Sequence, residues 1–299
     1  MDYCLPSGYQ PRLEPRPRIG EDNLPEWLPD VHLEAASIAR KLGARRIIEI
    51  GCGSAERLAS LYPAFDIVGV SRRPIIEACR QRYGFGSWLE LDLDCDDSLG
   101  LDDLGDSLIL CAGLLERLVH PERLLSLLSD AFARGVSGVV LSTPDRAMSD
   151  GPDHTGPPSD TAHSREWTLS ELERLLSSAG LDGVFGRTRT SDLIPSLGTI
   201  LAILPGRSED VHAAVLDWFD EYERRLLLVE ERERAIGQQL AWTAQLRAER
   251  DWFAQQLAWT AQLRAERDWF AQQRAAWEER ALHFPRRLAG IARRGRDRP

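Results

Sequence analysis

The chain has 299 residues, of which 43% are hydrophobic and 28% charged, and its formal net charge is −10. This composition is typical of a globular protein with one substantial core, and the negative charge argues against a nucleic-acid-binding surface. No apolar run approaches the ~20 residues that a membrane-spanning helix needs, and residues 1–20 lack the apolar region of a secretory signal.

The cysteines are odd in number, scattered and without C-x-x-C spacing. They are Cys4, Cys52, Cys79, Cys95 and Cys111. This pattern argues against a disulfide framework and against a zinc site, so we expect a cytoplasmic protein with no bound metal.

Residues 1–30 are rich in proline and charge and show no periodicity, so we expect an extended arm or lid over the domain that follows. Strands and helices then alternate over residues 31–206. The expected helices are 31–43, 57–63, 74–84, 121–135 and 168–181, the last opened by the capping box of Thr168 and Glu171. The expected strands are 45–50, 65–71, 87–93, 107–113, 137–144 and 198–205.

Strands that are separated by helices of about 10–15 residues form βαβ units. We therefore predict an α/β fold with a doubly wound, mostly parallel sheet in residues 31–206. In such sheets, ligands bind beyond the carboxyl ends of the strands, at the point where the strand order reverses.

The pattern changes after residue 206. Residues 207–283 carry no strand signal, no proline and a single glycine, Gly237, so we expect a long helical extension. Within it the segment QQLAWTAQLRAERDWFA occupies 238–254 and recurs unchanged at 255–271. An arginine-rich tail follows at 284–299.

The repeat does not fit a strict heptad. At 100° per residue, equivalent positions 17 residues apart lie about 100° out of phase on a straight helix. The apolar stripe of Trp242, Leu246, Phe253 and Leu257 accordingly breaks and restarts from Trp259. We expect residues 208–283 to dock onto a second copy or a partner rather than to fold back, and the basic tail to offer contact with an anionic membrane surface.

The stretch IIEIGCGSAER at 47–57 places Gly51 and Gly53 in a turn directly after an expected strand. Glycines there let a ligand approach the backbone closely, although a plain tight turn is the simpler alternative. A dinucleotide site needs a third glycine in G-x-G-x-x-G, and that position is Glu56. The alternative pattern is E-x-G-x-G, which begins here at Glu49.

Over residues 40–204 the chain resembles the class I S-adenosylmethionine-dependent methyltransferases. Five segments in order carry the resemblance: EIGCGSA, LDLD at 91–94, LILCAGLLERLVHPERLL at 108–125, GVVLSTPDR at 138–146, and HSREWTLSELERLLSSAGL at 163–181. The resemblance implies a Rossmann-like methyltransferase sheet and S-adenosylmethionine as the cofactor.

The resemblance also implies a set of cofactor-binding positions. The turn of Gly51, Cys52 and Gly53 would approach the methionine part of the cofactor, with Glu49 steering its amino group. Asp92 and the backbone of Leu93 would meet the adenine, and Cys111 and Ala112 would line the floor below the sulfonium.

The chain departs from the family pattern at several positions. Ser71 stands where a carboxylate normally binds both ribose hydroxyls, which is a loss of ~1–3 kcal/mol of binding. Gly113 and Arg117 replace the usual Asp and His of the fourth-strand segment, whereas Glu116 is retained. These departures leave open a non-catalytic interaction protein with a degenerate methyltransferase domain.

A third alternative is an NADP-dependent oxidoreductase. Arg72 and Arg73 are residues that a ribose 2′-phosphate would attract. The missing third glycine argues against this alternative, as does Ser37 in place of a tyrosine four residues before Lys41.

Methyl transfer from a sulfonium needs alignment and exclusion of water, and a base only where an acceptor hydroxyl must lose a proton. His163 is the candidate general base, with a surface-loop histidine as the alternative, and His154 is a poorer candidate. We expect Asp145, Arg146 and Arg165 to contact the substrate. By analogy with similar domains in bacterial polysaccharide assembly, we expect O-methylation of a small-molecule or glycan acceptor.

Overall fold

A computed structural model describes residues 3–16, 31–93, 96, 99–101, 103–188, 198–206 and 209–294 of the chain. These residues divide into two compact units, Met1–Arg224 and Arg225–Pro299. Each unit is described below by itself.

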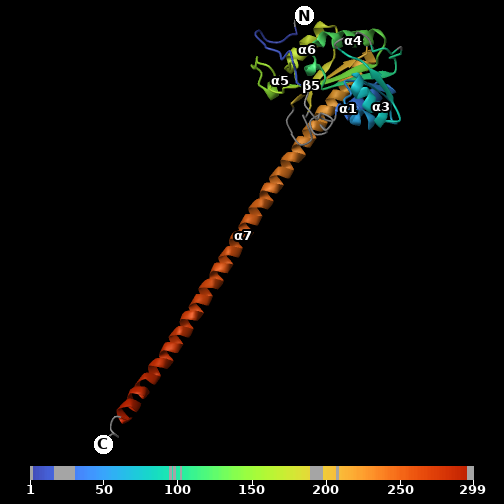
Figure 1. The fold of residues 1–299 in the computed structure, drawn as a ribbon. Helices are drawn as coiled ribbons and strands as arrows, with labels where there is room; N and C mark the ends of the chain where they lie inside the picture. The colour runs from blue at the N-terminus through green and yellow to red at the C-terminus, as the bar shows by residue number, and fades with distance from the viewer. Residues whose placement is uncertain are drawn as a thin grey trace. The chain divides into compact units, whose positions relative to one another are not determined.

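Seven described strands form one sheet in the first unit (Figure 1). They are β1 (Arg46–Ile50), β2 (Asp66–Ser71), β3 (Ser87–Glu90), β4 (Ser107–Ala112), β5 (Gly138–Pro144), β6 (Val184–Thr188) and β7 (Thr199–Pro205). Their order is β3-β2-β1-β4-β5-β7-β6, and β7 runs antiparallel to both of its neighbours while the other pairings are parallel. The predicted doubly wound, mostly parallel sheet is confirmed.

Helices cover both faces of this sheet. The described helices of the first unit are α1 (Val31–Lys41), α2 (Glu56–Ala59), α3 (Arg73–Arg82), η2 (a 3-10 turn, Leu115–Arg117), α4 (Pro121–Ala133), α5 (Arg146–Ser149) and α6 (Leu169–Ser178). In Figure 1, α4 and α6 lie on one side of the sheet, and α1 and α3 lie on the other.

The side chains of β1 point to both faces of the sheet, and the two faces differ in polarity. Its residues alternate, so Ile48 and Ile50 enter the core formed with α4 and α6, while Ile47 and Glu49 point to the opposite face. Glu49 there meets His32 of α1. A strand that is buried on both faces normally consists of consecutive apolar residues. In RIIEI the charged Glu49 interrupts that run.

The strand β6 was not predicted from the sequence. Its segment VFGRT is only partly apolar and has Gly186 at its centre. It forms because β7 offers a free edge, where Gly186 pairs with Leu201. A Cβ at Gly186 would overlap the ring of Phe219, so this glycine lets an aromatic side chain of α7 lie directly on the strand.

The helix α7 (Glu209–Arg294) begins in the first unit and continues through the second. Val215, Trp218, Phe219 and Tyr222 are buried near its start, and the Trp218 indole donates to Ser37 Oγ of α1 at 3.2 Å. The first compact unit therefore ends at Arg224, beyond the expected boundary at residue 206. The helix also runs past the expected end of the extension at residue 283.

No described helix is both long enough and apolar enough to cross a membrane. The second unit is a single helix over the residues that the structure describes, and nearly every side chain described in it is exposed.

Candidate functional site

The carboxyl ends of the parallel strands meet along one edge of the sheet. The strand order reverses between β1 and β4, because the chain moves outward from β1 to β3 and then returns to the other side of β1. A crevice at such a reversal is where open α/β sheets bind ligands. The glycine turn follows β1 at this position.

The glycine turn has a left-handed backbone. Gly51 has φ 81°, Gly53 has φ 52° and Ala55 has φ 56°. A Cβ at Gly51 would lie 2.9 Å from the flexible Cδ1 methyl of Leu114, so the positive φ, more than this contact, selects glycine there. A Cβ at Gly53 would meet no heavy atom within 4 Å, so this glycine borders open space that a ligand can approach.

Glu49 is buried beside the turn, with 4% of its surface exposed. Its Oε1 lies 2.9 Å from Nε2 of His32, while its Oε2 has no hydrogen-bond partner among the described residues. A buried carboxylate with one oxygen unpaired suits a ligand ammonium group. The structure therefore fits the predicted role of Glu49 toward the amino group of a bound cofactor.

The cysteines near the turn are neutral thiols. Burial, with the nearby charge of Glu49, raises the pKa of Cys52 and of Cys111 far above the ordinary value of a thiol. The Cys79 thiol lies 3.6 Å from the Gly53 carbonyl oxygen. Cys111 is wholly buried in the core on the side of α4 and α6, so its side chain does not line a ligand site at the edge of the sheet.

Ser71, which stands where the family pattern has a carboxylate, is the last residue of β2. In the sheet register Ser71 lies beside Glu90, the last residue of β3. The Arg73 guanidinium contacts both oxygens of Glu90, with Nε at 2.9 and 3.0 Å. Arg73 is thus already paired with a carboxylate, which disfavours it as a ligand of a nucleotide phosphate.

Asp92 follows β3 and is partly exposed, as is Leu93. The Asp92 backbone N–H donates to the Asp96 carboxylate at 2.8 Å, and the Asp96 N–H donates to the Asp92 carbonyl at 2.7 Å. These bonds form a tight turn at the edge of the sheet directly after β3.

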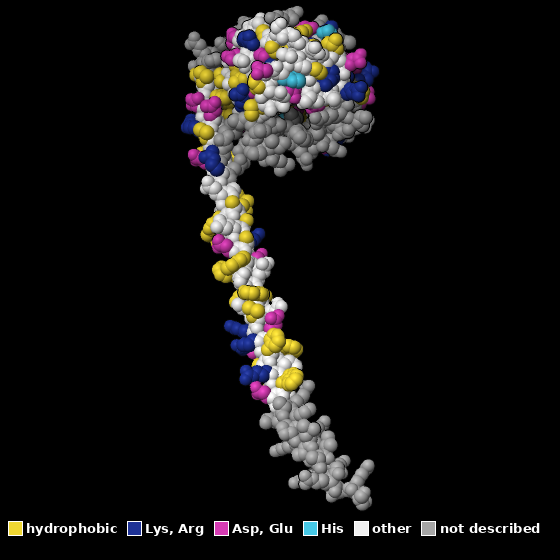
Figure 2. Space-filling view, turned by 90° about the vertical axis from the view of Figure 1, so that its left-hand side faces the viewer, with side chains coloured by type: hydrophobic (Ala, Val, Ile, Leu, Met, Phe, Trp, Pro, Cys, Tyr) yellow, Lys and Arg dark blue, Asp and Glu magenta, His cyan; other side chains and the backbone are white. Residues whose placement is uncertain are grey.

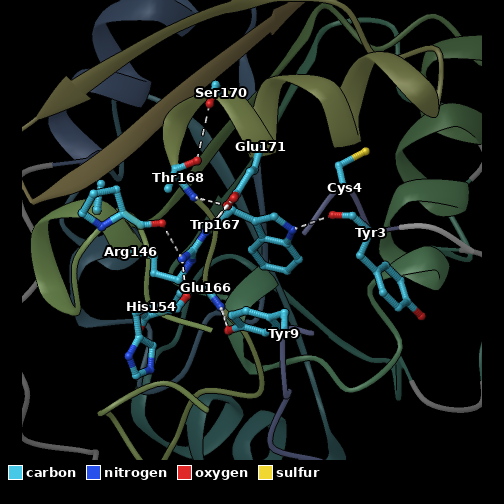
Figure 3. A network of polar contacts seen from close by, with 12 residues as sticks. Tyr3, Cys4, Tyr9, Arg146, His154, Glu166, Trp167, Thr168, Ser170 and Glu171 are labelled. Atoms are coloured by element: carbon cyan, nitrogen blue, oxygen red, sulfur yellow. Dashed lines mark hydrogen bonds and ion pairs between the residues drawn. The ribbon is translucent and has the colours of Figure 1, made fainter. Parts of the chain in front are cut away.

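Two residues predicted to contact the substrate are buried in ion pairs. Arg146 is wholly buried and binds both oxygens of Glu171 at 2.6 Å, and it also donates to the carbonyls of Pro152 and His154 (Figure 3). Asp145 is also wholly buried and accepts from Arg187 at 2.6 Å. In this conformation both side chains fix the loop after β5 and present no surface to a substrate.

The N-terminal arm lies against that loop. The backbone N–H groups of Gln10, Arg12 and Arg16 donate to carbonyls of residues 155, 164 and 161. The Arg12 guanidinium adds bonds to the carbonyls of Pro158, Asp160 and His163 at 2.8, 2.6 and 2.9 Å. In Figure 3 the Trp167 indole donates to the Tyr3 carbonyl, and the Glu166 N–H donates to the Tyr9 hydroxyl.

The arm also encloses Arg165. An open pocket of about 250 Å³ is lined by Arg165 together with arm residues, among them Tyr3 and Tyr9. The Arg165 guanidinium lies 4.5 Å from the centre of the Tyr3 ring and donates to the carbonyls of Leu118 and Val119. Burial lowers the pKa of Arg165 from its ordinary value. Of the three predicted substrate contacts, Arg165 is the one that borders a pocket.

His163 lies among carboxylates. Its Nδ1 is 2.5 Å from Oε1 of Glu166, and its Nε2 is 3.6 Å from Oδ2 of Asp160. Burial disfavours the charged imidazolium, but the hydrogen bond to Glu166 and the charges of Glu116, Glu166 and Asp160 outweigh it and raise the pKa of His163 above 6.5. A base oriented by a carboxylate is a recurrent catalytic arrangement.

Glu116 connects this cluster with the glycine turn. Its carbonyl accepts from the N–H groups of Ser164 and Arg165 at 2.7 and 3.2 Å. Burial raises the pKa of its carboxyl, against the opposing charges of His163 and Arg117. Glu116 belongs to η2, which directly follows Leu114, and the Leu114 side chain packs against Gly51. A chain of contacts therefore connects the turn after β1, the η2 turn after β4 and the His163 segment that follows β5.

Sequence reasoning missed several of these partners. His32 has no local signature, because its role depends on α1 crossing the sheet at Glu49. Glu166 lies three residues after His163, and that spacing was the available signal. Among the described residues, no group of three or more His, Cys, Asp or Glu side chains is arranged to hold a metal ion.

No protein-family model and no curated protein sequence matches the chain. Solved structures are similar to it in fold. The small RNA methyltransferase HEN1 is 18% identical with a TM-score of 0.45, over 60% of this chain and 25% of that one. The apo form of the S-adenosylmethionine-dependent methyltransferase SibL is 21% identical with a TM-score of 0.40, over 58% and 55%.

A third similar structure is the N-terminal domain of EvdMO1 in the presence of S-adenosylhomocysteine and D-fucose. It is 23% identical with a TM-score of 0.41, over 60% of this chain and 83% of that one. The chain thus spans about a quarter of the HEN1 chain and about half of the SibL chain.

Proposed function

We propose that the chain is an S-adenosylmethionine-dependent methyltransferase that acts on a hydroxyl oxygen of a small-molecule or glycan acceptor. The observation that carries the proposal is the E-x-G-x-G turn after β1, at the reversal of strand order. Beside it, one oxygen of the buried Glu49 carboxylate has no hydrogen-bond partner among the described residues. The five motif segments, in the order that the family has them, support it independently.

The residues present fit the cofactor in part. Glu49 and the open face of Gly53 suit its amino-acid end. The turn at Asp92 follows β3, which lies two strands away from β1 in the sheet. Ser71 supplies one hydrogen bond where the family has a carboxylate, so we expect modest affinity. When bound, S-adenosylmethionine supplies an electrophilic methyl group.

His163 has the properties of the proton acceptor. In its neutral form, Nδ1 donates to Glu166, and Nε2, which lies 3.6 Å from Oδ2 of Asp160, is the nitrogen that can accept the proton of the acceptor hydroxyl. The raised pKa makes this imidazole a stronger base than an exposed histidine. Arg165 borders the open pocket beside the same loop, where it suits a polar or anionic part of the acceptor.

Two other functions compete with this proposal. A non-catalytic interaction protein is favoured by Ser71 and by the aromatic extension that follows the domain. An NADP-dependent oxidoreductase is the weaker alternative, since Arg73 is paired with Glu90 and Glu56 replaces the third glycine.

Titration calorimetry of the full chain separates these functions. The experiment compares S-adenosylmethionine, S-adenosylhomocysteine and NADPH as ligands. Micromolar binding of S-adenosylhomocysteine is the result expected of a methyltransferase. Absence of binding by all three ligands would support the interaction protein, and binding of NADPH alone would support the oxidoreductase.

A further inference from the structure

The second unit exposes a long row of large apolar side chains. Figure 2 shows hydrophobic side chains recurring along α7. Residues 240–277 include five tryptophans, two phenylalanines and four leucines, and these side chains are 42–72% exposed. Soluble proteins rarely leave so much contiguous apolar surface without a partner.

The spacing of these residues has a period of 17, in two identical copies. The two identical copies place Leu246 above Leu263 and Phe253 above Phe270. Residues 221–237 share no identical residue with these copies, but Val229 and Ile236 are apolar at the positions of Leu246 and Phe253. Apolar residues at these two positions therefore recur from Val229 to Phe270, and Trp277 follows at the position that corresponds to Thr260.

A period of 17 residues equals five helical turns of 3.4 residues, or two heptads plus three residues. An insertion of three residues overwinds a left-handed coiled coil locally. At 3.4 residues per turn, Trp242, Leu246, Trp252 and Phe253 fall within an arc of about 110°, and the next copy returns to the same arc. We call this arc, with its equivalents Trp259, Leu263, Trp269 and Phe270, the 17-residue seam.

The first leucine of each copy lies off this seam. Leu240 and Leu257 fall about 60° beyond the edge of the arc. They are 65% and 71% exposed, compared with 42% and 43% for Leu246 and Leu263. Glu249 and Gln256 lie within the arc, and polar residues at such positions lower stability but fix the register of a helix pair.

The exposed area suits a stable protein interface. Each of the seven aromatic side chains in residues 240–277 is more than half exposed, and each buries about 150–250 Å² when covered. Their exposed surface is on the order of 800 Å², which is the share that one partner contributes to a standard interface.

The charges favour a second copy of the helix as the occupant. Each 17-residue copy carries two arginines and two acidic residues, and residues 225–279 carry eight arginines against nine acidic residues. A surface with balanced charge does not repel its own copy and lacks the basic excess that draws helices to anionic lipid.

The first unit is too small to cover this helix. Residues 225–279 span about 80 Å at 1.5 Å per residue, whereas a domain of 224 residues has a radius of gyration of roughly 17 Å. α7 also continues from Glu209 to Arg294 as one helix. We propose that residues 225–279 pair with the same segment of a second copy along the 17-residue seam, forming an overwound left-handed coiled coil.

The experiment uses the full chain and two matched double variants. Leu246→Glu with Leu263→Glu alters the seam, and Leu240→Glu with Leu257→Glu places the same changes at equivalent positions off the seam. We expect sedimentation equilibrium to give a dimer for the unaltered chain. The seam variant should raise the dissociation constant by at least about a hundredfold, because each buried leucine contributes on the order of tenfold or more.

The off-seam variant should change the dissociation constant by less than about threefold. Circular dichroism at a concentration where both variants are monomeric shows whether the substitutions alter helicity by themselves. If the full chain is still a monomer at about 50 µM, the proposal is overturned. It is also overturned if the two variants change the dissociation constant equally. A monomer that binds anionic phosphatidylserine vesicles would identify lipid as the occupant instead.

Discussion

Gly53 and Gly180 have similar left-handed backbones but lie in different places. Their φ angles are 52° and 72°, and a Cβ at either would meet no heavy atom within 4 Å. Gly53 lies in the turn at the reversal of strand order, whereas Gly180 follows α6. Alanine variants at these two glycines can therefore distinguish the cost of backbone strain from an effect on ligand binding.

Alanine at either glycine should lower the unfolding free energy by about 1–2 kcal/mol, which is the strain of a left-handed L-residue. Only Gly53→Ala should weaken S-adenosylhomocysteine binding, by at least about tenfold, because its methyl group enters the open space beside the turn. Calorimetry and thermal unfolding of both variants provide the measurement. Equal affinities for the two variants would place the cofactor site elsewhere.

Glu166 is one of the groups that raise the pKa of His163. Its hydrogen bond and charge help to raise the pKa of that imidazole. A base acts in its deprotonated form, so a raised pKa places the acid limb of kcat/KM above pH 6.5.

Glu166→Gln keeps an acceptor oxygen and removes the charge. We expect the acid limb of the pH profile to move to lower pH, with kcat reduced because the remaining base is weaker. His163→Asn should remove the limb altogether and leave S-adenosylhomocysteine affinity unchanged. A profile that is identical in the unaltered chain and in both variants would rule His163 out as the base.

The same shift affects stability. The folded pKa of His163 is raised, so its contribution to folding is fully present below pH 6.5 and is lost as pH rises through the folded pKa. Glu116 has the same sign, because its folded pKa is also raised. Both groups therefore favour the folded state more at the acid side of their titration.

At the scale of elements, the arm and the loop after β5 act as one structure. Arg12 donates to three carbonyls of the loop, one of them that of His163. Arg16 lies on the same arm and is exposed, and its backbone pairs with Thr161. These two arginines provide a matched comparison.

Arg12→Ala should lower the unfolding free energy by about 2 kcal/mol, since it leaves buried carbonyls without donors. It should also lower kcat while cofactor affinity stays unchanged, because the His163 loop loses its anchor. Arg16→Ala should do neither, and Arg12→Lys should recover only part of the loss. If turnover persists in Arg12→Ala despite the lower stability, the arm has no positioning role.

Local signals predicted the elements that depend on local physics. The capping box of Thr168 and Glu171 is present as predicted, with the Thr168 N–H donating to Glu171 at 2.8 Å. The glycine turn after β1 was likewise readable, because a left-handed backbone selects glycine. The alternation of strands and helices was sufficient for the fold class.

Other features depend on contacts between distant segments, which a single sequence does not reveal. Glu171 also binds Arg146, and this ion pair turned a predicted substrate contact into a structural residue. The strand β6 has weak propensity and depends on β7 and on Phe219. His32 meets Glu49 only because of how α1 crosses the sheet.

At the scale of the whole molecule, the boundary of the first compact unit decides how the chain can be divided. The sequence placed that boundary at residue 206, where the last strand ends. Contacts place it at Arg224, because the start of α7 packs on α1 and β6. Trp218, Phe219 and Tyr222 form an aromatic cluster there, and the Tyr222 hydroxyl bonds to Thr188 of β6.

Two truncations test this boundary. A chain of residues 1–224 should fold, remain soluble and bind S-adenosylhomocysteine with the affinity of the full chain. A chain of residues 1–206 loses four buried side chains and exposes Gly186 and α1, and large buried aromatics contribute about 3–5 kcal/mol each. That loss is comparable to the whole stability of a domain, so the shorter chain should aggregate or melt at a much lower temperature. Phe219→Ala in the full chain should lower the melting temperature in the same direction without removing any backbone. If the two truncated chains have equal melting temperatures, residues 207–224 do not stabilise the first unit. The boundary would then lie at residue 206, and the start of α7 would belong to the extension.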